Sequence, residues 1–263
     1  MRILLDELRL RRFSLTVWTL SVILTVAMVD LLYPSIGSNS GYDEVMQNMP
    51  EELQALFGAV DMSTPMGYLS IELYSFFLPA ILIAYAVGRG AACVAGEEEG
   101  HTLDLLLAQP VSRTSVYLQK ALAMVVGVVI LSAASMLTTV VLAGPSDMTS
   151  IPLDQLFAVT LHQALLALTF GVIALAVAVA TGRRGPGIAV AAGYAFLSYL
   201  VEGLGKTIDW LGNLRPLSPW NWYSSEEPLL QGISPVDVGV FAAVVLVVAA
   251  VGLVVFDRRD LHA

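Results

Sequence analysis

The sequence predicts an all-α integral membrane protein with six transmembrane helices. Of its 263 residues, 57% are hydrophobic and only 13% are charged, which is too little polar surface for a water-soluble globule of this size. Six apolar runs reach the length of about 18 residues that crosses a hydrocarbon core; they are 15–33, 66–88, 116–143, 153–181, 187–205 and 236–256. Because the runs are continuous and do not alternate with polar residues, they indicate helices rather than barrel strands.

The first twelve residues are predicted to form an amphipathic elbow helix along the membrane surface. Apolar residues such as Leu4 and Leu8 are interleaved with charged residues such as Asp6 and Arg9, a pattern typical of an interfacial helix. A cleaved signal peptide is disfavoured, because the apolar run that follows is long and carries no small-residue cleavage motif.

Short external helices and an aromatic segment are expected between the spans. In residues 48–58, Asn48 can cap a helix that has Pro50 and Glu51 in its first turn and Gly58 as its stop. Residues 205–235 contain three Trp, one Tyr and four Pro, and aromatic residues of this density are typical of the membrane interface. No internal repeat or linker divides the chain, so we expect a single transmembrane domain over residues 1–263.

The basic residues predict the orientation of the spans. Once six spans are drawn, eleven of the 13 Lys and Arg residues fall on the side of the termini, and only Lys206 and Arg215 fall on the other. By the positive-inside rule, both termini are then cytoplasmic. The net charge of −9 disfavours a nucleic-acid partner, and the single cysteine, Cys93, excludes an intrachain disulfide.

The most polar short stretch, "GEEEGHTLDLLLAQPVSR" (96–113), lies between the second and third spans. A short helix is expected from about Glu97 to Gln109, ended by Pro110, with Leu103, Leu106 and Leu107 on one apolar stripe. A cytoplasmic helix of this length needs the lipid surface or another protein to cover such a stripe. The acidic residues of the segment, including Asp104, favour a protein groove over anionic lipid.

Several ionisable residues lie inside the predicted spans, where they are costly and therefore mark candidate functional sites. Asp30, Glu72 and Glu202 occur at similar depth near the outer ends of three spans, and His162 lies inside the fourth. These four residues form a candidate substrate path. The three carboxylates fit either a vestibule that attracts cations or ordinary hydrated groups at the membrane surface.

No catalytic constellation or metal site is expected. Glu98 and His101 have the i, i+3 spacing of a carboxylate-bridged metal site, but the sequence offers no second such pair, so a solvated polar face is favoured. The signature motifs of serine hydrolases, zinc proteases and P-loop ATPases are all lacking. The chain is therefore not expected to hydrolyse ATP by the P-loop route.

The segment 96–113 resembles the cytoplasmic coupling segment of the permease subunits of ABC type-2 exporters, which reads G-E-E-E-x-G-T-L-E/D-L-L-L-A-x-P-V-S-R. The matching positions are Glu97, Glu98, Glu99, Thr102, Leu103, Leu105, Leu106, Leu107, Pro110, Ser112 and Arg113. The chain departs from the pattern at positions 99–101, where it reads "EGH", which leaves the role of His101 open. Its ending "FDRRDL" and its "LRPLSPWNWYSSEEPLLQG" loop are also similar to that family.

This resemblance implies a dimeric permease in a prokaryotic plasma membrane, paired with cytoplasmic ABC ATPase subunits that bind ATP and Mg²⁺, while this chain binds no cofactor. The second permease copy could be identical or related. The residues implied in ATPase coupling are Glu97, Glu98, Glu99, His101, Thr102, Leu103, Asp104, Leu106, Leu107, Pro110 and Arg113. The substrate would be moved outward. The acidic outer loops with Asp30, Glu72 and Glu202, rather than the resemblance, favour a cationic or amphiphilic molecule that is drug-like or lipid-like.

Two other functions compete with transport. A membrane anchor or assembly factor that recruits an ATPase could use the same coupling segment. A membrane-embedded metallohydrolase is less favoured, because the chain lacks a reactive constellation. ATP-dependent movement of a substrate would separate a transporter from an anchor.

Overall fold

The computed structural model describes residues 2–36, 50, 64–103, 108, 110–224 and 227–259. Within them, six helices are long and apolar enough to cross a membrane: Arg12–Ser35, Pro65–Ala92, Arg113–Leu142, Leu153–Thr181, Arg184–Leu204 and Pro235–Arg258. Each overlaps one predicted span, with ends that differ by only a few residues. The all-helical, six-span prediction is confirmed.

The elements follow the chain in this order. The N-terminal arm consists of α1 (Arg2–Leu10) and α2 (Arg12–Ile36). The second span combines α5 (Pro65–Leu69), the π-helix η1 (Ser70–Tyr74) and α6 (Phe77–Ala92), and α7 (Ala95–Glu99) follows it. The remaining long helices are α9 (Arg113–Leu142), α10 (Leu153–Thr181), α11 (Arg184–Leu204) and α15 (Pro235–Arg258). Short helices α12 (Asp209–Gly212), η2 (Arg215–Leu217), α13 (Pro219–Ser224) and α14 (Pro228–Gln231) lie between α11 and α15.

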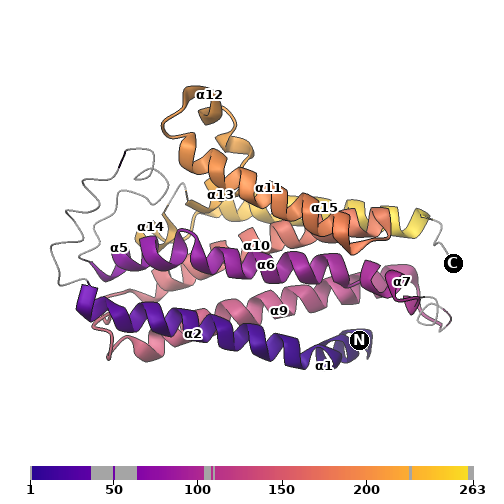
Figure 1. Ribbon diagram of the computed structural model, residues 1–263, viewed down its shortest axis with the longest axis horizontal. Coiled ribbons are helices and arrows are strands. Elements are labelled where there is room, and N and C mark those ends of the chain that lie inside the picture. Colours follow the sequence, from indigo (N-terminus) through magenta and orange to yellow (C-terminus); the bar gives the residue numbers. More distant parts are fainter. Residues whose placement is uncertain are drawn as a thin grey trace.

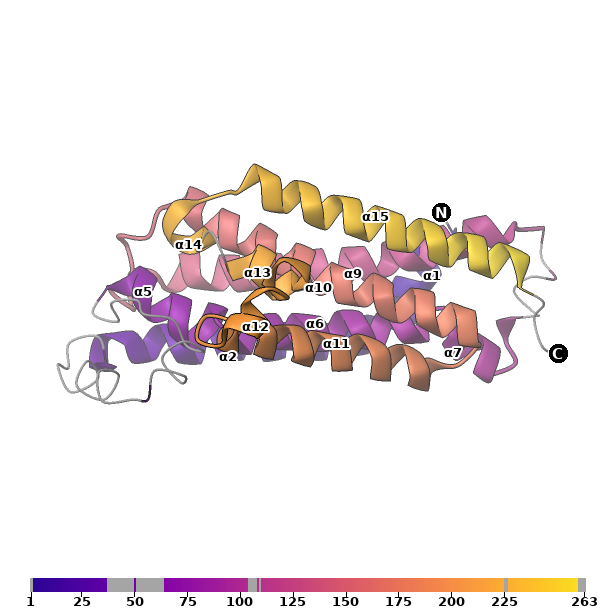
Figure 2. The ribbon, with the colours of Figure 1, turned by 90° about the horizontal axis from the view of Figure 1, so that it is seen from above.

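The long helices run side by side along one axis (Figure 1). Helix α1, helix α7 and the last turn of α15 lie at one end, called the terminal end below, whereas α5 and α14 lie at the opposite, distal end, and α13 lies in the distal half further from that end (Figures 1 and 2). Because consecutive spans alternate in direction, residues far apart in sequence meet at each end of the bundle.

Helix α10 is the centre of the bundle and packs against α6, α9, α11 and α15. Its closest approach is to α6, where a Cβ added to Gly90 would lie 2.1 Å from the carbonyl oxygen of Gly171. Small residues at such a crossing allow two apolar helices to gain packing contacts in a membrane, where burial from water contributes little. Helices α2 and α15 leave much of their apolar surface exposed, as expected of lipid-facing or partner-facing spans.

The two short helices expected outside the spans have different outcomes. Helix α1 exists and packs against α9, with the Leu4 amide donating to the Gln119 side chain at 3.3 Å; its placement on a lipid surface stays a prediction. The external helix expected at 48–58 lies outside the described residues, apart from Pro50.

Candidate functional site

The polar segment after the second span lies at the terminal end of the bundle, as helix α7 and the turn that follows it (Figure 1). The expectation of one continuous helix from 97 to 109 is wrong: α7 already begins at Ala95 and ends at Glu99. The chain then turns through Gly100 and His101, and the Thr102 amide donates to the Glu97 carbonyl at 2.8 Å. Glu98 and His101 therefore do not share one helix face.

His101 occupies the position that a glycine normally fills at such a helix end. Its φ is +53°, and its amide donates to the Glu98 carbonyl at 3.1 Å. Together with the bond from Thr102, this is the paired hydrogen-bond pattern of a Schellman cap, which favours glycine at the left-handed residue. The unusual order "EGH" thus places a histidine, one of the residue types that tolerate this region, where the family pattern has glycine.

The three consecutive glutamates each pair with a cation from a different part of the bundle. Glu97 Oε1 lies 2.5 Å from Lys120 Nζ on α9, and Glu99 Oε2 lies 2.5 Å from Arg184 Nε on α11. Glu98 Oε1 accepts a hydrogen bond from Arg259 Nη2, just after α15. We call these three pairs the glutamate clasp. Since the partners come from three spans, α7 ties the terminal ends of α9, α11 and α15 together.

Lys120 is the most buried member of the clasp, with 1% of its side chain exposed. It also contacts Glu7 on α1 at 3.1 Å, and Glu7 accepts a bond from Arg89 on α6 at 2.5 Å. Burial raises the pKa of Glu7, but the charge of Lys120 and the hydrogen bond from Arg89 outweigh it and hold the pKa below its usual range. The network therefore pairs two acids, Glu7 and Glu97, with the cations Lys120 and Arg89 and with Arg11, which lies 3.6 Å from Glu7, and it joins α1 and α6 to the clasp.

The Glu98–Arg259 pair connects α7 to the end of α15 at the terminal end of the bundle. Arg259 also donates through Nη1 to the Val179 carbonyl at 2.5 Å, and Arg113 donates to the Arg259 carbonyl at 2.8 Å. Gly182, with φ +68°, ends α10 directly beside this pair: an added Cβ would lie 2.8 Å from Glu98 Oε1. Arg113, expected in ATPase coupling, thus joins the start of α9 to the end of α15.

Glu99 caps the start of α11. Its Oε1 accepts the Arg184 backbone amide at 2.8 Å while its Oε2 pairs with the same residue's guanidinium. The bond from the Arg184 amide and then the bond from its side chain lower the pKa of Glu99. A carboxylate on a free helix N-terminal amide is also favoured by the helix dipole.

The apolar stripe expected on this segment is divided by the fold. Leu103 is only 2% exposed and belongs to a cluster of the chain's own core with Cys93, Tyr117 and Phe256. Thr102 and Pro110 are exposed. Asp104, Leu106 and Leu107 lie outside the described residues, so their part in a docking surface stays a prediction.

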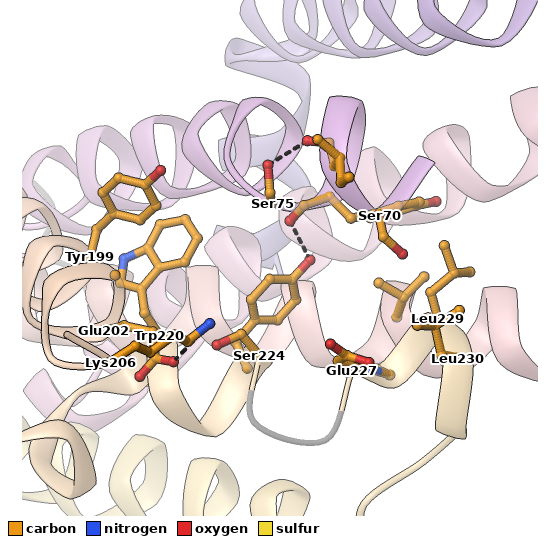
Figure 3. Close-up of a pocket in the computed structure, with 16 residues that line it drawn as sticks. Ser70, Ser75, Tyr199, Glu202, Lys206, Trp220, Ser224, Glu227, Leu229 and Leu230 are labelled. Carbon is orange, nitrogen blue, oxygen red and sulfur yellow. Dashed lines mark hydrogen bonds and ion pairs between the residues drawn. The ribbon is translucent and has the colours of Figure 1, made fainter. Parts of the chain in front are cut away.

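A cavity of about 120 Å³ opens at the distal end, between η1, α10, α11, α13 and α14 (Figure 3). Its aromatic wall is a chain of ring contacts, with Tyr199 and Trp220 centred 5.0 Å apart and Trp220 and Tyr223 5.9 Å apart. Leu229 and Leu230 form the other side. The cavity is therefore mainly apolar and fits a hydrophobic or aromatic group.

Buried hydrogen bonds hold the aromatic wall in place. Trp220 Nε1 donates to the Ala195 carbonyl at 3.0 Å, and the Tyr223 hydroxyl donates to the Tyr74 carbonyl at 2.8 Å. Burial keeps the pKa of Tyr223 far above its usual value, so this hydroxyl stays a donor. Trp220 and Tyr223, expected at the lipid interface, are both 4% exposed and pack inside the protein.

The four residues of the candidate substrate path do not share one site. Glu202 lines the distal cavity, whereas Glu72, Asp30 and His162 are not among its lining residues. The expectation of hydrated carboxylates is wrong for Asp30 and Glu202, which are 0% and 6% exposed. Folding of the segment after α11 explains Glu202: Arg215 on η2 holds its two carboxylate oxygens at 2.9 and 3.0 Å, so its charge is balanced within the chain.

Three residues of the charged network at the terminal end were not predicted from the sequence: Glu7, Arg89 and Lys120. The available signal was that Arg89 and Lys120 are isolated cations at the ends of otherwise apolar runs, and such residues need a partner at membrane depth. Among the residues that the structure describes, no group of three or more His, Cys, Asp and Glu side chains could hold a metal ion.

The six apolar helices, joined at one end by charged pairs, define a membrane domain that crosses the bilayer several times. The chain belongs to the ABC-2 family of transporter proteins, since the family profile described as "ABC-2 family transporter protein" matches residues 1–261. A search of curated proteins found no match.

Proposed function

We propose that this chain is the permease subunit of an ATP-driven exporter, with its terminal end in the cytoplasm. Membership of the ABC-2 family supports the permease role, and the likeness of residues 96–113 to an exporter coupling segment supports an ATPase partner and outward movement. ATP and Mg²⁺ belong to that partner. A second permease copy completes the path through the membrane.

The observation that carries this proposal is the glutamate clasp. Three adjacent carboxylates of one short segment are paired with cations inside, at the start of and just after three different spans. A partner that pushes the segment would therefore move α9, α11 and α15 together rather than bend one loop. Two arrangements of a packed bundle, biased by ATP binding to the partner, are the usual basis of such a transition.

The orientation is supported by the distribution of charge. The cations of the clasp and of its neighbourhood, Lys120, Arg89, Arg113, Arg184 and Arg259, all gather at the terminal end. At the distal end, Lys206 and Arg215 both form ion pairs with Glu202. An excess of cations on one side is typical of the cytoplasmic face.

The distal cavity supports an amphiphilic substrate. Tyr199, Trp220 and Tyr223 offer aromatic surface for an apolar group, while the charge of Glu202 is already matched by Arg215. Selection of cations by Glu202 is therefore disfavoured, and the apolar part of a lipid-like or drug-like molecule fits the lining better.

The function is tested by purifying the tagged chain from its native membranes in mild detergent. We expect an ABC ATPase to co-purify, with ATP hydrolysis that is sensitive to vanadate and stimulated by amphiphiles after reconstitution into vesicles. ATP-dependent movement of a stimulating amphiphile establishes transport. A purified complex that hydrolyses ATP but moves none of the compounds that stimulate it would favour the anchor function, and a chain that purifies without any ATPase would contradict the proposal.

A further inference from the structure

A buried polar cluster crosses the distal half of the bundle, away from the clasp, and shares one residue, Tyr74, with the lining of the distal cavity. Its members are Asp30 on α2, Tyr74 at the end of η1, Thr139 on α9 and Thr160 on α10. Their exposed fractions are 0%, 3%, 2% and 7%. Four separate elements thus contribute one oxygen-bearing side chain each to a site closed to solvent.

The side-chain oxygens of this cluster lie close together but do not form hydrogen bonds with one another. Asp30 lies beside Thr139, and the Tyr74 hydroxyl lies close to Thr139 and Thr160 and within the field of the Asp30 charge. Yet both carboxylate oxygens of Asp30, the Tyr74 hydroxyl and the Thr139 hydroxyl lack a hydrogen-bond partner. Thr160 donates to the Leu156 carbonyl at 2.7 Å and keeps its lone pairs for another group.

A carboxylate buried in this way requires neutralisation, since an isolated buried charge costs many kcal/mol. Among the ion pairs of the described residues, none includes Asp30, whereas Glu7, Glu97 and Glu202 all have cationic partners. The unpartnered set is made of oxygen alone, the ligand type that hard cations prefer. One carboxylate balances one positive charge.

The backbone at this point is unusual as well. Tyr74 ends a π-helical turn, Ser70–Tyr74, within the second span. Single π-turns inside helices occur frequently at functional sites, because the widened turn moves a side chain out of the normal helical register. Tyr74 stands at the end of this turn, and its hydroxyl lies close to Thr139 on α9 and Thr160 on α10.

We propose that Asp30, Tyr74, Thr139 and Thr160 form a binding site for a monovalent cation of the size of sodium. The ion supplies the positive charge that Asp30 lacks and the ligand that the hydroxyls lack. In doing so it holds α2 against the second span, α9 and α10. This site does not depend on the ATPase partner or on the substrate of the exporter.

Thermal unfolding of the purified full-length chain tests the proposal, with NaCl exchanged for choline chloride at constant ionic strength so that screening does not change. For wild type we expect a saturable rise in Tm with sodium, of about 5 °C at a hundredfold excess over Kd. Choline should give none. Asp30→Asn, which removes the charge, should unfold at a temperature independent of sodium.

Hydroxyl variants keep the test sharp if Asp30→Asn folds poorly. Thr139→Val should weaken the sodium response at least several-fold, whereas Thr138→Val should keep it, because Thr138 is half-buried and its hydroxyl donates to the Ala134 carbonyl of its own helix. A wild-type Tm that is the same in sodium and choline would overturn the proposal and leave Asp30 a simple protonated acid. An equal sodium response in wild type, Thr139→Val and Thr138→Val would overturn it too.

Discussion

Glu98 and Arg259 are 161 positions apart, and their side chains form a hydrogen-bonded ion pair at the terminal end, with only 10% and 16% of those side chains exposed. Arg259 follows the last span and Glu98 follows the second. The pair therefore connects the acidic segment to the end of the chain through the partly buried edge of the bundle.

Exchanging the two charges tests whether this contact holds the junction together. Glu98→Arg and Arg259→Glu should each lower the Tm of the purified chain, because each places like charges side by side. The double variant should recover much of the loss, with a coupling energy of about 1–3 kcal/mol. Losses that simply add in the double variant would show that the two side chains act independently.

Lys120 should be the most costly single cation to remove. Lys120→Met leaves Glu7 and Glu97 without their shared partner, and breaking a buried pair destabilises by about 3–5 kcal/mol. Lys206→Met is the matched control, since Lys206 is 42% exposed and lies 3.8 Å from Glu202, which keeps Arg215; its cost should be about 0–1 kcal/mol. Thermal unfolding of both variants measures the difference, and equal losses would contradict the network.

The stability contributed by Glu7 should depend on acid pH. Its folded-state pKa is held below the 4.5 of an unperturbed glutamate by Lys120 and Arg89 despite burial. A lowered pKa means that the contribution is complete above pH 4.5 and is lost as the pH falls through the folded value. The Tm difference between wild type and Glu7→Gln should therefore be constant near neutral pH and shrink below about pH 4.5. A difference that does not change between pH 7 and pH 3 would contradict this origin.

Much of this architecture could be predicted from the sequence, because uninterrupted apolar runs have few alternatives in a membrane. The six spans and their order followed from that pattern. The partners of Glu97, Glu98 and Glu99 could not, since Lys120, Arg259 and Arg184 are brought to one end only by the packing of α9, α11 and α15. A run of three glutamates can be exposed to solvent or paired inside the protein, and the local sequence does not distinguish the two.

The same limit explains Leu103 and Trp220. Periodicity places Leu103 on a stripe with Leu106 and Leu107, but the left-handed turn at His101 shifts the chain so that Leu103 enters the core. Aromatic content predicts the membrane end where Trp220 lies. It does not reveal that short helices fold this side chain back over α11.

Cysteine labelling on intact cells tests the orientation. The native Cys93 is buried, and burial raises its pKa to about 12, so its thiol should react very slowly and leave a low background. Ser150→Cys, exposed at the distal end, should label with a membrane-impermeant maleimide, whereas Arg183→Cys, exposed at the terminal end, should label only after the membrane is opened. The reverse pattern would place the terminal end outside the cell.

We expect residues 104–107 to contact the ATPase, whereas Leu103 belongs to the core of the permease itself. Leu106→Asp and Leu103→Asp test it directly, by co-purification of the ATPase beside thermal unfolding of the permease alone. Leu106→Asp should weaken ATPase binding at least about tenfold without changing Tm, and Leu103→Asp should lower Tm because it forces a charge into the core. If Leu106→Asp binds the ATPase as well as wild type does, or unfolds the permease by itself, the coupling function of this segment is contradicted.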